Sequence, residues 1–358
     1  MENIIYNNNS LINKIDDDAK ILGKGAYGCV IPKVIKCNND NKEIIDKGTT
    51  QVSKLLLNKY DFEKEVKNTL FINKNDKGNT SIIIDDTCIL NENNILDILH
   101  KNNIESKFLQ NCGISFRNNK VYQIIYNKRG ITLREVINKR LLSITTIIKL
   151  FYNLYKGILL FNKLNFVHFD IKQDNVIYIE NDKKFVFIDF GLSSLYSDIL
   201  LKKTLQDYGS SPRYYYPPEF IAFSLWFKKN DDSYENNFRS FKYLYEYELI
   251  SLSDNNNIIK KIILYNHYND HNNYENELKK LYNEYYSSND PYKVLSKSLN
   301  KIDIYSLSIT LYRTIEKYKK KNSYINNFYK YILFPALHIN PYKRISINKI
   351  LYNYKKFI

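Results

Sequence analysis

The sequence predicts an α+β protein of two lobes, in which a small strand-rich lobe precedes a larger and mainly helical one. Its 358 residues suffice for about two lobes of roughly 150 residues each. Strand patterns dominate before Gly130, whereas helical patterns dominate after it. The hydrophobic fraction of 44% and the charged fraction of 25% are ordinary for a globular protein, so wholesale disorder is excluded.

The small lobe is expected to span residues 15–127, after a polar N-terminal tail at 1–14. Glycines punctuate Ile21–Cys37, which predicts two strands joined by a tight turn. Acidic residues near the start of Tyr60–Ile72 favour a helix there. Further strands are predicted at Gln51–Leu57, Ser81–Ile84 and Val121–Tyr126.

The larger lobe is expected to span residues 128–358. An apolar stripe at helical spacing predicts a long helix over Ile144–Leu164. A stretch rich in Asn, Tyr, Lys and Asp at about 220–302 predicts an elaborated insertion, within which Tyr274–Tyr286 is a candidate helix. The remaining predicted elements are the strands Val176–Ile179 and Phe185–Ile188 and the helices Ile302–Ile315 and Ile345–Tyr354.

The formal net charge of +15 raises the question of a nucleic-acid partner. No basic-aromatic array or nucleic-acid motif accompanies the charge, so a solvated lysine-rich surface is the preferred interpretation. Docking on acidic substrates or on membranes remains a further role for such a surface. No run reaches the roughly 18 apolar residues of a membrane span, and no signal peptide is visible.

The four cysteines contain no C-x-x-C pair. This pattern argues against a disulfide framework and against a cysteine zinc site. It predicts a reducing compartment such as the cytoplasm.

The first motif with chemical meaning is Gly23-Lys-Gly25-Ala-Tyr-Gly28-Cys-Val30, which lies between two predicted strands. Glycines allow the backbone to turn tightly and to approach phosphate oxygens. Tyr27 is placed to cover such phosphates. The predicted strand after Gly28 argues against a dinucleotide site, which needs a helix there, and an ordinary glycine-rich hairpin is the alternative.

The second motif is Val167-His-Phe-Asp170-Ile-Lys172-Gln-Asp-Asn175, between a long helix and a strand. The Asp170 carboxylate is suited to accept a proton from an attacking hydroxyl, and Lys172 to neutralise a transferring phosphoryl group. Asn175 offers an amide oxygen to a hard cation such as Mg²⁺. The alternative is a solvated polar loop.

The third motif is Asp189-Phe190-Gly191, which follows the predicted strand Phe185–Ile188. It begins 19 residues after Asp170, with Asn175 between them. Asp189 is expected to bind Mg²⁺, with Phe190 packed to hold it.

With these three motifs in order, the chain resembles eukaryotic-type protein kinases, and in particular the serine/threonine kinases. The resemblance covers about Lys20 to the C-terminus. It implies that Asp170 is the catalytic base and that Asn175 and Asp189 bind Mg²⁺. It also implies a two-lobed kinase-like fold with ATP bound by the glycine-rich loop. Lys172 is the serine/threonine-type feature.

Three further positions match the family. Tyr216-Pro-Pro-Glu219 resembles the A-P-E that closes the activation segment, with Pro for Ala. Asp303 matches the residue that braces the backbone of the catalytic loop. Arg344 matches the arginine that pairs with the glutamate, so the resemblance implies a structural Glu219–Arg344 ion pair.

The lysine that anchors the α/β-phosphates is less clearly marked. Lys54, within a strand pattern, is preferred over Lys36, which lies only 8 residues after Gly28. Its partner on the following helix is expected to be Glu65, with Glu63 as the alternative. The 11 residues from Lys54 to Glu65 are fewer than the family usually has. The backbone at Tyr126–Lys128 is expected to form the hinge that holds adenine.

Two departures from the family concern regulation. Phe169 stands where many kinases have an arginine that reads a phosphate on the activation loop, so activity is expected not to need that phosphate. Gly209–Pro212 resembles the substrate-facing loop with an extra residue, which leaves the role of Ser211 open. Candidate phosphorylation sites in this segment are Ser193, Ser194, Thr204, Ser210 and Ser211.

The sequence thus predicts a serine/threonine kinase that uses ATP and Mg²⁺ to phosphorylate protein substrates. The motif residues and the composition resemble kinases encoded by large DNA viruses, which would place the protein in the host cytoplasm or the virion. The alternatives are a pseudokinase scaffold that binds protein partners and, less favoured, a small-molecule kinase.

Overall fold

The computed structural model describes residues 22–24, 28–32, 34–35, 51–90, 120–200, 215–227, 233–250, 271–318 and 322–358. Contacts divide the chain into two compact units. Unit 1 comprises Met1–Ile131 and Ile177–Gly191, and unit 2 comprises Thr132–Val176 and Leu192–Ile358. Each unit consists of two separate segments of the chain, because Ile177–Gly191 belongs with the N-terminal strands.

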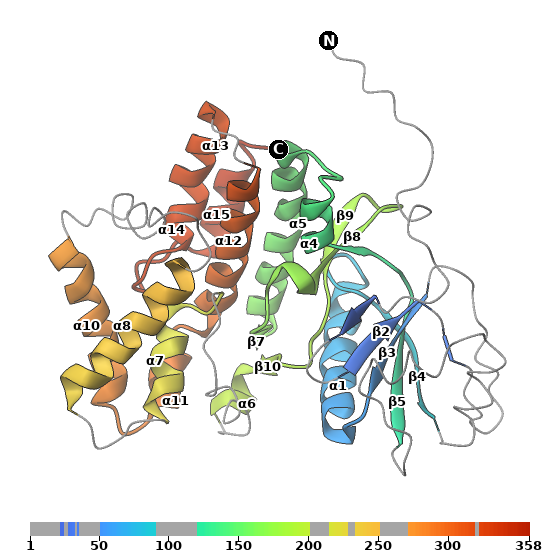
Figure 1. Ribbon diagram of the computed structural model, residues 1–358, viewed down its shortest axis with the longest axis horizontal. Coiled ribbons are helices and arrows are strands. Elements are labelled where there is room, and N and C mark those ends of the chain that lie inside the picture. The colour runs from blue at the N-terminus through green and yellow to red at the C-terminus, as the bar shows by residue number, and fades with distance from the viewer. Residues whose placement is uncertain are drawn as a thin grey trace. The chain divides into compact units, whose positions relative to one another are not determined.

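Unit 1 is built on a five-stranded antiparallel sheet in the order β1-β2-β3-β5-β4. Its inner strand β5 is buried at every residue, because β3 and β4 flank it and helix α1 packs on the sheet (Figure 1). The strands are β1 (Gly23–Lys24), β2 (Gly28–Ile31), β3 (Val52–Leu56), β4 (Ile84–Leu90) and β5 (Val121–Tyr126). The predictions for β3 and β5 and for the β1–β2 hairpin are confirmed.

Helix α1 (Lys59–Asp76) follows β3 after only two residues. The Asn58 side chain caps it by accepting hydrogen bonds from the backbone of Tyr60 and Asp61. The helix ends in the left-handed conformation at Lys77, where φ is 50°. Its residue Asp76 then accepts hydrogen bonds from Thr80 and Ser81.

The predicted strand Ser81–Ile84 is wrong, since the strand β4 runs over Ile84–Leu90. Asp76 holds Ser81 in a loop that makes only an isolated bridge to Phe187. Ile82 is buried there with the apolar cluster of unit 1. A short apolar run therefore marked a buried loop and not a strand.

Strands β8 (Val176–Ile179) and β9 (Lys184–Phe187) agree with their predictions. Strand β6 (Ile131–Thr132) lies at the unit boundary.

Unit 2 is mainly helical around α5 (Ile144–Lys163) and α12 (Leu299–Lys317). Helix α5 is the one helix in the described ranges whose length and apolar content would suit a membrane span. Half of its apolar window is buried inside the structure, and α12 and α15 (Ile347–Tyr354) pack against it, as in a core helix. The predictions for α5, for α12 and for the last helix are confirmed, apart from end residues.

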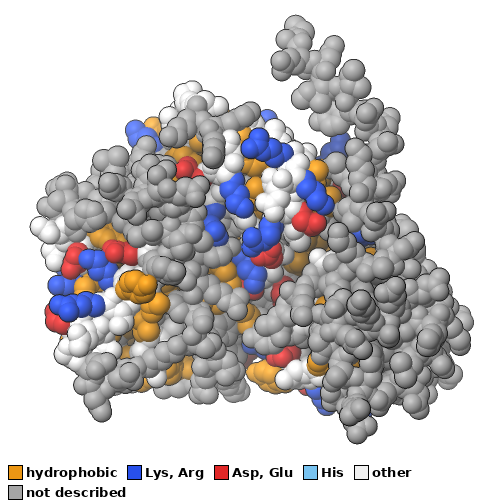
Figure 2. All heavy atoms as spheres, in the orientation of Figure 1, with side chains coloured by type: hydrophobic (Ala, Val, Ile, Leu, Met, Phe, Trp, Pro, Cys, Tyr) orange, Lys and Arg blue, Asp and Glu red, His pale blue; other side chains and the backbone are white. Residues whose placement is uncertain are grey.

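The other elements of unit 2 surround this pair. They are α4 (Leu133–Asn138), β7 (Phe166–Val167), the 3-10 turn η2 (Gln173–Asn175), β10 (Ser194–Leu195), α6 (Tyr196–Leu200), α7 (Pro218–Trp226), α8 (Tyr234–Ile250), α10 (His271–Tyr286), α11 (Pro291–Ser296), α13 (Ser323–Phe328), the π-helix η4 (Tyr329–Leu333), α14 (Phe334–Ala336) and α15 (Ile347–Tyr354). Helix α10 contains the predicted helix Tyr274–Tyr286. On the face drawn in Figure 2, the described Lys and Arg side chains have Asp and Glu side chains among them.

The cysteines require a correction, because the structure has Cys29 and Cys88 in disulfide bonds. These two residues are not bonded to one another. They lie on β2 and β4, which β3 and β5 separate, so roughly 14 Å of sheet lies between them. The chain's other cysteines, Cys37 and Cys112, fall outside the described residues. Cysteine spacing along the chain did not reveal these bonds, and the predicted reducing compartment loses its support from the cysteine pattern.

Candidate functional site: two groups of polar residues

Unit 1 brings Lys54, Glu65 and Asp189 together. Lys54 lies in the middle of β3 and donates from Nζ to both Glu65 oxygens, at 2.9 Å and 2.7 Å, and to Asp189 Oδ1 at 3.0 Å. The predicted Lys54–Glu65 pair is therefore present. Glu63 instead lies exposed, 3.5 Å from Lys59. The 11-residue separation suffices because α1 begins so soon after β3. The competing Lys36 lies outside the described residues.

Tyr126 adds a contact that the sequence did not predict. Its hydroxyl donates to Glu65 Oε1 at 2.7 Å, while its backbone pairs with Val52 and Ile84 in the sheet. The Tyr126 side chain thus contacts the Lys54–Glu65 pair through Glu65. The hinge role of the Tyr126 backbone stays a prediction. A tyrosine on the strand beside the lysine strand was the signal that could have suggested this contact.

Burial and charge fix the protonation states of this group. Burial lowers the pKa of Lys54, but the Asp189 and Glu65 carboxylates outweigh it and raise that pKa above its usual value. Burial raises the pKa of Glu65, with Lys54 opposing. Burial, together with the Glu65 charge, raises the pKa of Tyr126 well above its usual value, so its hydroxyl stays a neutral donor. The group holds one cation against two carboxylates.

Asp189 follows β9 with its backbone in the left-handed region, at φ 65°. This conformation is uncommon for a residue other than glycine and marks a strained turn. The next residue, Phe190, is fully buried, and its carbonyl accepts a hydrogen bond from Asn68 of α1 at 3.0 Å. The strained turn is thereby tied to the helix that carries Glu65.

The glycine-rich segment is described in part. Gly28 must be glycine, because a Cβ there would lie 1.9 Å from the Leu55 carbonyl oxygen of β3. Val30 packs against the apolar cluster that includes Val52 and Ile177. Gly23 pairs with Val30 in the β1–β2 hairpin. The predicted phosphate-binding residues Gly25 and Tyr27 fall outside the described residues.

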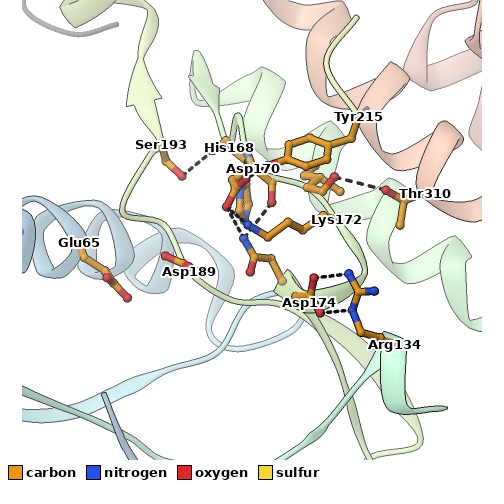
Figure 3. A network of polar contacts seen from close by, with 12 residues as sticks. Glu65, Arg134, His168, Asp170, Lys172, Asp174, Asp189, Ser193, Tyr215 and Thr310 are labelled. Atoms are coloured by element: carbon orange, nitrogen blue, oxygen red, sulfur yellow. Dashed lines mark hydrogen bonds and ion pairs between the residues drawn. The ribbon is translucent and has the colours of Figure 1, made fainter. Parts of the chain in front are cut away.

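Unit 2 gathers donors around the carboxylate of Asp170 (Figure 3). Asp170 Oδ2 accepts from Lys172 Nζ at 2.7 Å and from Asn175 Nδ2 at 2.6 Å. The Asn175 amide also donates to the Asp170 carbonyl oxygen at 2.9 Å. The Tyr215 hydroxyl donates to Asp170 Oδ1, a contact that the sequence did not predict. The three predicted catalytic residues are thus neighbours, and Asp170 is oriented at both oxygens.

A buried aspartate braces the loop that carries Asp170. Asp303 of α12 accepts from the backbone N–H of His168 at 2.8 Å and of Phe169 at 3.2 Å. Phe169 needs this support, since a bulky residue at φ 63° is strained. Burial raises the pKa of Asp303 to about 7, although the two backbone donors lower it. The predicted brace is confirmed.

The ion pair between Glu219 and Arg344 is confirmed as well. Two parallel hydrogen bonds of 2.6 Å and 3.0 Å join the side chains, and both are 0% exposed. Glu219 lies in the first turn of α7, and Arg344 lies just before α15. The pair ties the segment that follows Tyr216 to the C-terminal part of unit 2.

The structure describes only part of the predicted activation segment. Phe169, where many kinases have arginine, is fully buried and packs on Phe220 with ring centroids 5.2 Å apart. Ser193 and Ser194 are buried as well, so neither hydroxyl is accessible for modification in this structure. The remaining positions, Thr204, Ser210, Ser211 and the range 209–212, fall outside the described residues.

Two features define a phosphotransferase of the kinase type. One is a lysine paired with a helix glutamate. The other is an aspartate that a lysine and an asparagine orient on a braced loop. Residues 18–236 match the family model for protein tyrosine and serine/threonine kinases. Because the match covers more than half of the chain, the chain belongs to this family. It has the α+β two-lobed kinase-like fold. No curated protein matches the chain, and the resemblance to kinases of large DNA viruses stays a sequence-based prediction.

Proposed function

We propose that this protein kinase transfers the γ-phosphate of Mg-ATP to serine and threonine hydroxyls of protein substrates. The observation that carries the proposal is the setting of Asp170, whose carboxylate is buried and held at both oxygens. A base held in this way is ready to orient an acceptor hydroxyl and to take its proton without reorganising.

The nucleotide side of the reaction is assigned to unit 1. Lys54 stays protonated in its buried position and is suited to anchor the α/β-phosphates. Glu65, supported by Tyr126, holds the lysine in place. One apolar cluster of unit 1 is suited to cover an adenine ring. It contains Val52 and Ile177, and Val30 packs against it.

The residues fit Mg²⁺ as the counter-ion. In unit 1, Asp189 lies 3.0 Å from Lys54 and offers carboxylate oxygens, the ligand type that Mg²⁺ prefers. In unit 2, the Asn175 side chain donates to Asp170 from Nδ2, and its Oδ1 is suited to bind the metal. Mg²⁺, when bound, would supply positive charge that neutralises the transferred phosphoryl group. Asp189 of unit 1 and Asn175 of unit 2 are each suited to bind it.

The choice of serine and threonine rests on Lys172. This residue lies two positions after the base and already contacts the Asp170 carboxylate, so its charge is next to the atom that receives the acceptor's proton. In the resemblance drawn from the sequence, a lysine at this position is typical of serine/threonine kinases.

The second candidate is a pseudokinase scaffold. Such proteins usually lack the lysine, the catalytic aspartate or the metal-binding aspartate, and this chain has Lys54, Asp170 and Asp189. The intact Lys54–Glu65 pair favours catalysis over a purely structural role. A small-molecule kinase is less favoured, because the Glu219–Arg344 pair belongs to the protein kinase pattern.

The proposal is tested by phosphoamino-acid analysis of protein substrates and of the chain itself after incubation with Mg-ATP. We expect phosphoserine or phosphothreonine, and none with Lys54→Met or Asp189→Asn. Thermal shift measures nucleotide binding separately, with and without Mg²⁺. Phosphotyrosine as the only product would refute the acceptor assignment, whereas nucleotide binding without transfer would support the scaffold.

A further inference from the structure

A group of basic side chains lies beside the loop that carries Asp170. Arg134 of α4 donates from Nε and Nη2 to the two carboxylate oxygens of Asp174, at 2.5 Å and 2.7 Å. Figure 3 shows this pair next to Asp170 and Lys172. Both side chains are partly exposed, at 46% and 40%. The acidic residue closest to Asn175 in the chain is therefore already neutralised by an arginine.

Two further cations of α12 belong to the same group. The pKa of Lys317 is lowered by burial and then by the charges of Arg134 and Arg313, while Asp174 opposes them. Geometry places α12 beside this pair, because Gln173, the residue before Asp174, donates from Nε2 to Thr314 Oγ1 at 3.2 Å, and Thr314 directly follows Arg313 in α12. We call Arg134, Arg313, Lys317 and Asp174 the basic flank. Its three cations and one anion leave two positive charges in excess.

The basic flank is within reach of a peptide whose hydroxyl lies on Asp170. Asp174 and Asn175 are consecutive residues of the η2 turn, with Cα atoms roughly 3.8 Å apart. The Asn175 amide contacts the Asp170 carboxylate at 2.6 Å. The Cα of Asp174 therefore lies within roughly 10 Å of that carboxylate, which is about three residues of extended chain.

We infer that the basic flank selects acceptor peptides with Asp or Glu within about three residues of the phosphorylated hydroxyl. This inference rests on the proposed function for the identity of the acceptor, but the basic flank itself stands without it. Acidic side chains at this distance gain attraction from the excess charge, whereas Lys or Arg are repelled. A general attraction from the net charge of +15 would not depend on the position of the acidic residue in the peptide.

Matched peptides test the inference in two assays. Peptides with one central serine and flanks of Asp, Ala or Lys are compared as substrates at low ionic strength, where surface charges are least screened. The same peptides with alanine for serine are compared for binding by fluorescence anisotropy. We expect the acidic peptide to exceed the lysine peptide about tenfold in kcat/KM and in affinity, with the neutral peptide between them.

Charge reversals locate the effect. Lys317→Glu is compared with Lys280→Glu, an exposed position on α10 that changes the net charge equally. We expect Lys317→Glu to weaken acidic-peptide binding about threefold or more, and Lys280→Glu to leave it unchanged. Equal losses in both variants would overturn the inference, because they would assign the preference to net charge alone.

The outcomes separate this inference from the proposed function. Acidic-peptide binding that depends on Lys317 but without phosphate transfer would refute the kinase activity and support the basic flank. Transfer with no preference among the three peptides would refute the basic flank and leave the activity standing. Lys317-dependent binding to anionic lipid vesicles, with none to acidic peptides, would overturn the inference in favour of a membrane surface.

Discussion

The buried ion pair between Glu219 and Arg344 gives the sharpest prediction about stability. Arg344 uses all five of its guanidinium N–H donors, on Glu219 and on the carbonyl oxygens of His338 and Lys301. Its guanidinium also lies over the Tyr305 ring, 5.0 Å from the centroid. Arg344→Met would leave the Glu219 charge and two carbonyl groups buried without this partner.

The magnitude follows from the cost of an uncompensated buried charge. Removing one partner of a buried pair costs about 3–5 kcal/mol in the free energy of unfolding. In a unit of roughly 200 residues, 1 kcal/mol shifts Tm by about 2–4 °C, so Tm of unit 2 should fall by about 6–20 °C. The double variant Glu219→Leu/Arg344→Met should lose less than either single variant, because no charge is left unpaired.

Urea unfolding followed by tryptophan fluorescence is the suitable assay. The chain has a single tryptophan, Trp226, in the same helix as Glu219, so its emission reports on unit 2. Lys139→Met serves as a control, since it removes only an exposed pair with Glu135 and should change stability by less than about 0.5 kcal/mol. A loss below about 1 kcal/mol for Arg344→Met would refute the reasoning.

Three further predictions concern the two groups of the site. Glu65→Gln should lower kcat/KM for ATP about 10²-fold, because Lys54 would be misplaced. Glu63→Gln changes an exposed residue nearby and should have no effect. Steady-state kinetics at varied ATP compares the two variants. Tyr126→Phe keeps the ring but removes a hydrogen bond to the buried Glu65 carboxylate, so KM for ATP should rise about tenfold; an unchanged KM would show that the hydroxyl does not position the pair. The pKa of Asp303 is about 7 in the folded state, above its unfolded value of about 3.9. At a pH between these two values, the folded state therefore keeps a proton that the unfolded state has released. The stability of the wild type should therefore fall relative to Asp303→Asn as the pH rises from 4 to 7, by about 4 kcal/mol at most, and parallel urea midpoints over this range would contradict the assignment.

Motifs with fixed order and spacing carried most of what the sequence could predict. Asp170, Lys172 and Asn175 lie within six residues, so their proximity follows from local geometry. Asp303 and the Glu219–Arg344 pair were found through the family resemblance, because long-range contacts leave no periodic trace in one sequence. Choosing Glu65 over Glu63 required the register of α1, which the two-residue connection after β3 fixes.

Contacts between residues distant in sequence account for what was missed. The hydroxyls of Tyr126 and Tyr215 reach carboxylates 61 and 45 residues away in the chain, and tyrosine is too abundant here for any single one to be noticed. The disulfide bonds of Cys29 and Cys88 were missed because the cysteines were judged by C-x-x-C spacing alone. The strand expected at Ser81 failed because the hydrogen bonds of Asp76 favour a loop there.

The most direct test of the central claim is transfer of labelled γ-phosphate from Mg-ATP by the wild type, Asp170→Asn and Asp182→Asn. Asp170→Asn keeps the shape of the side chain but removes the base. Asp182→Asn makes the same change at a residue whose ion pairs, with Lys128 and Lys184, are not part of the candidate site. We predict transfer to serine or threonine by the wild type and by Asp182→Asn, and a loss of at least about 10²-fold in kcat for Asp170→Asn. Equal transfer by the wild type and Asp170→Asn would contradict the assignment of Asp170 as the catalytic base.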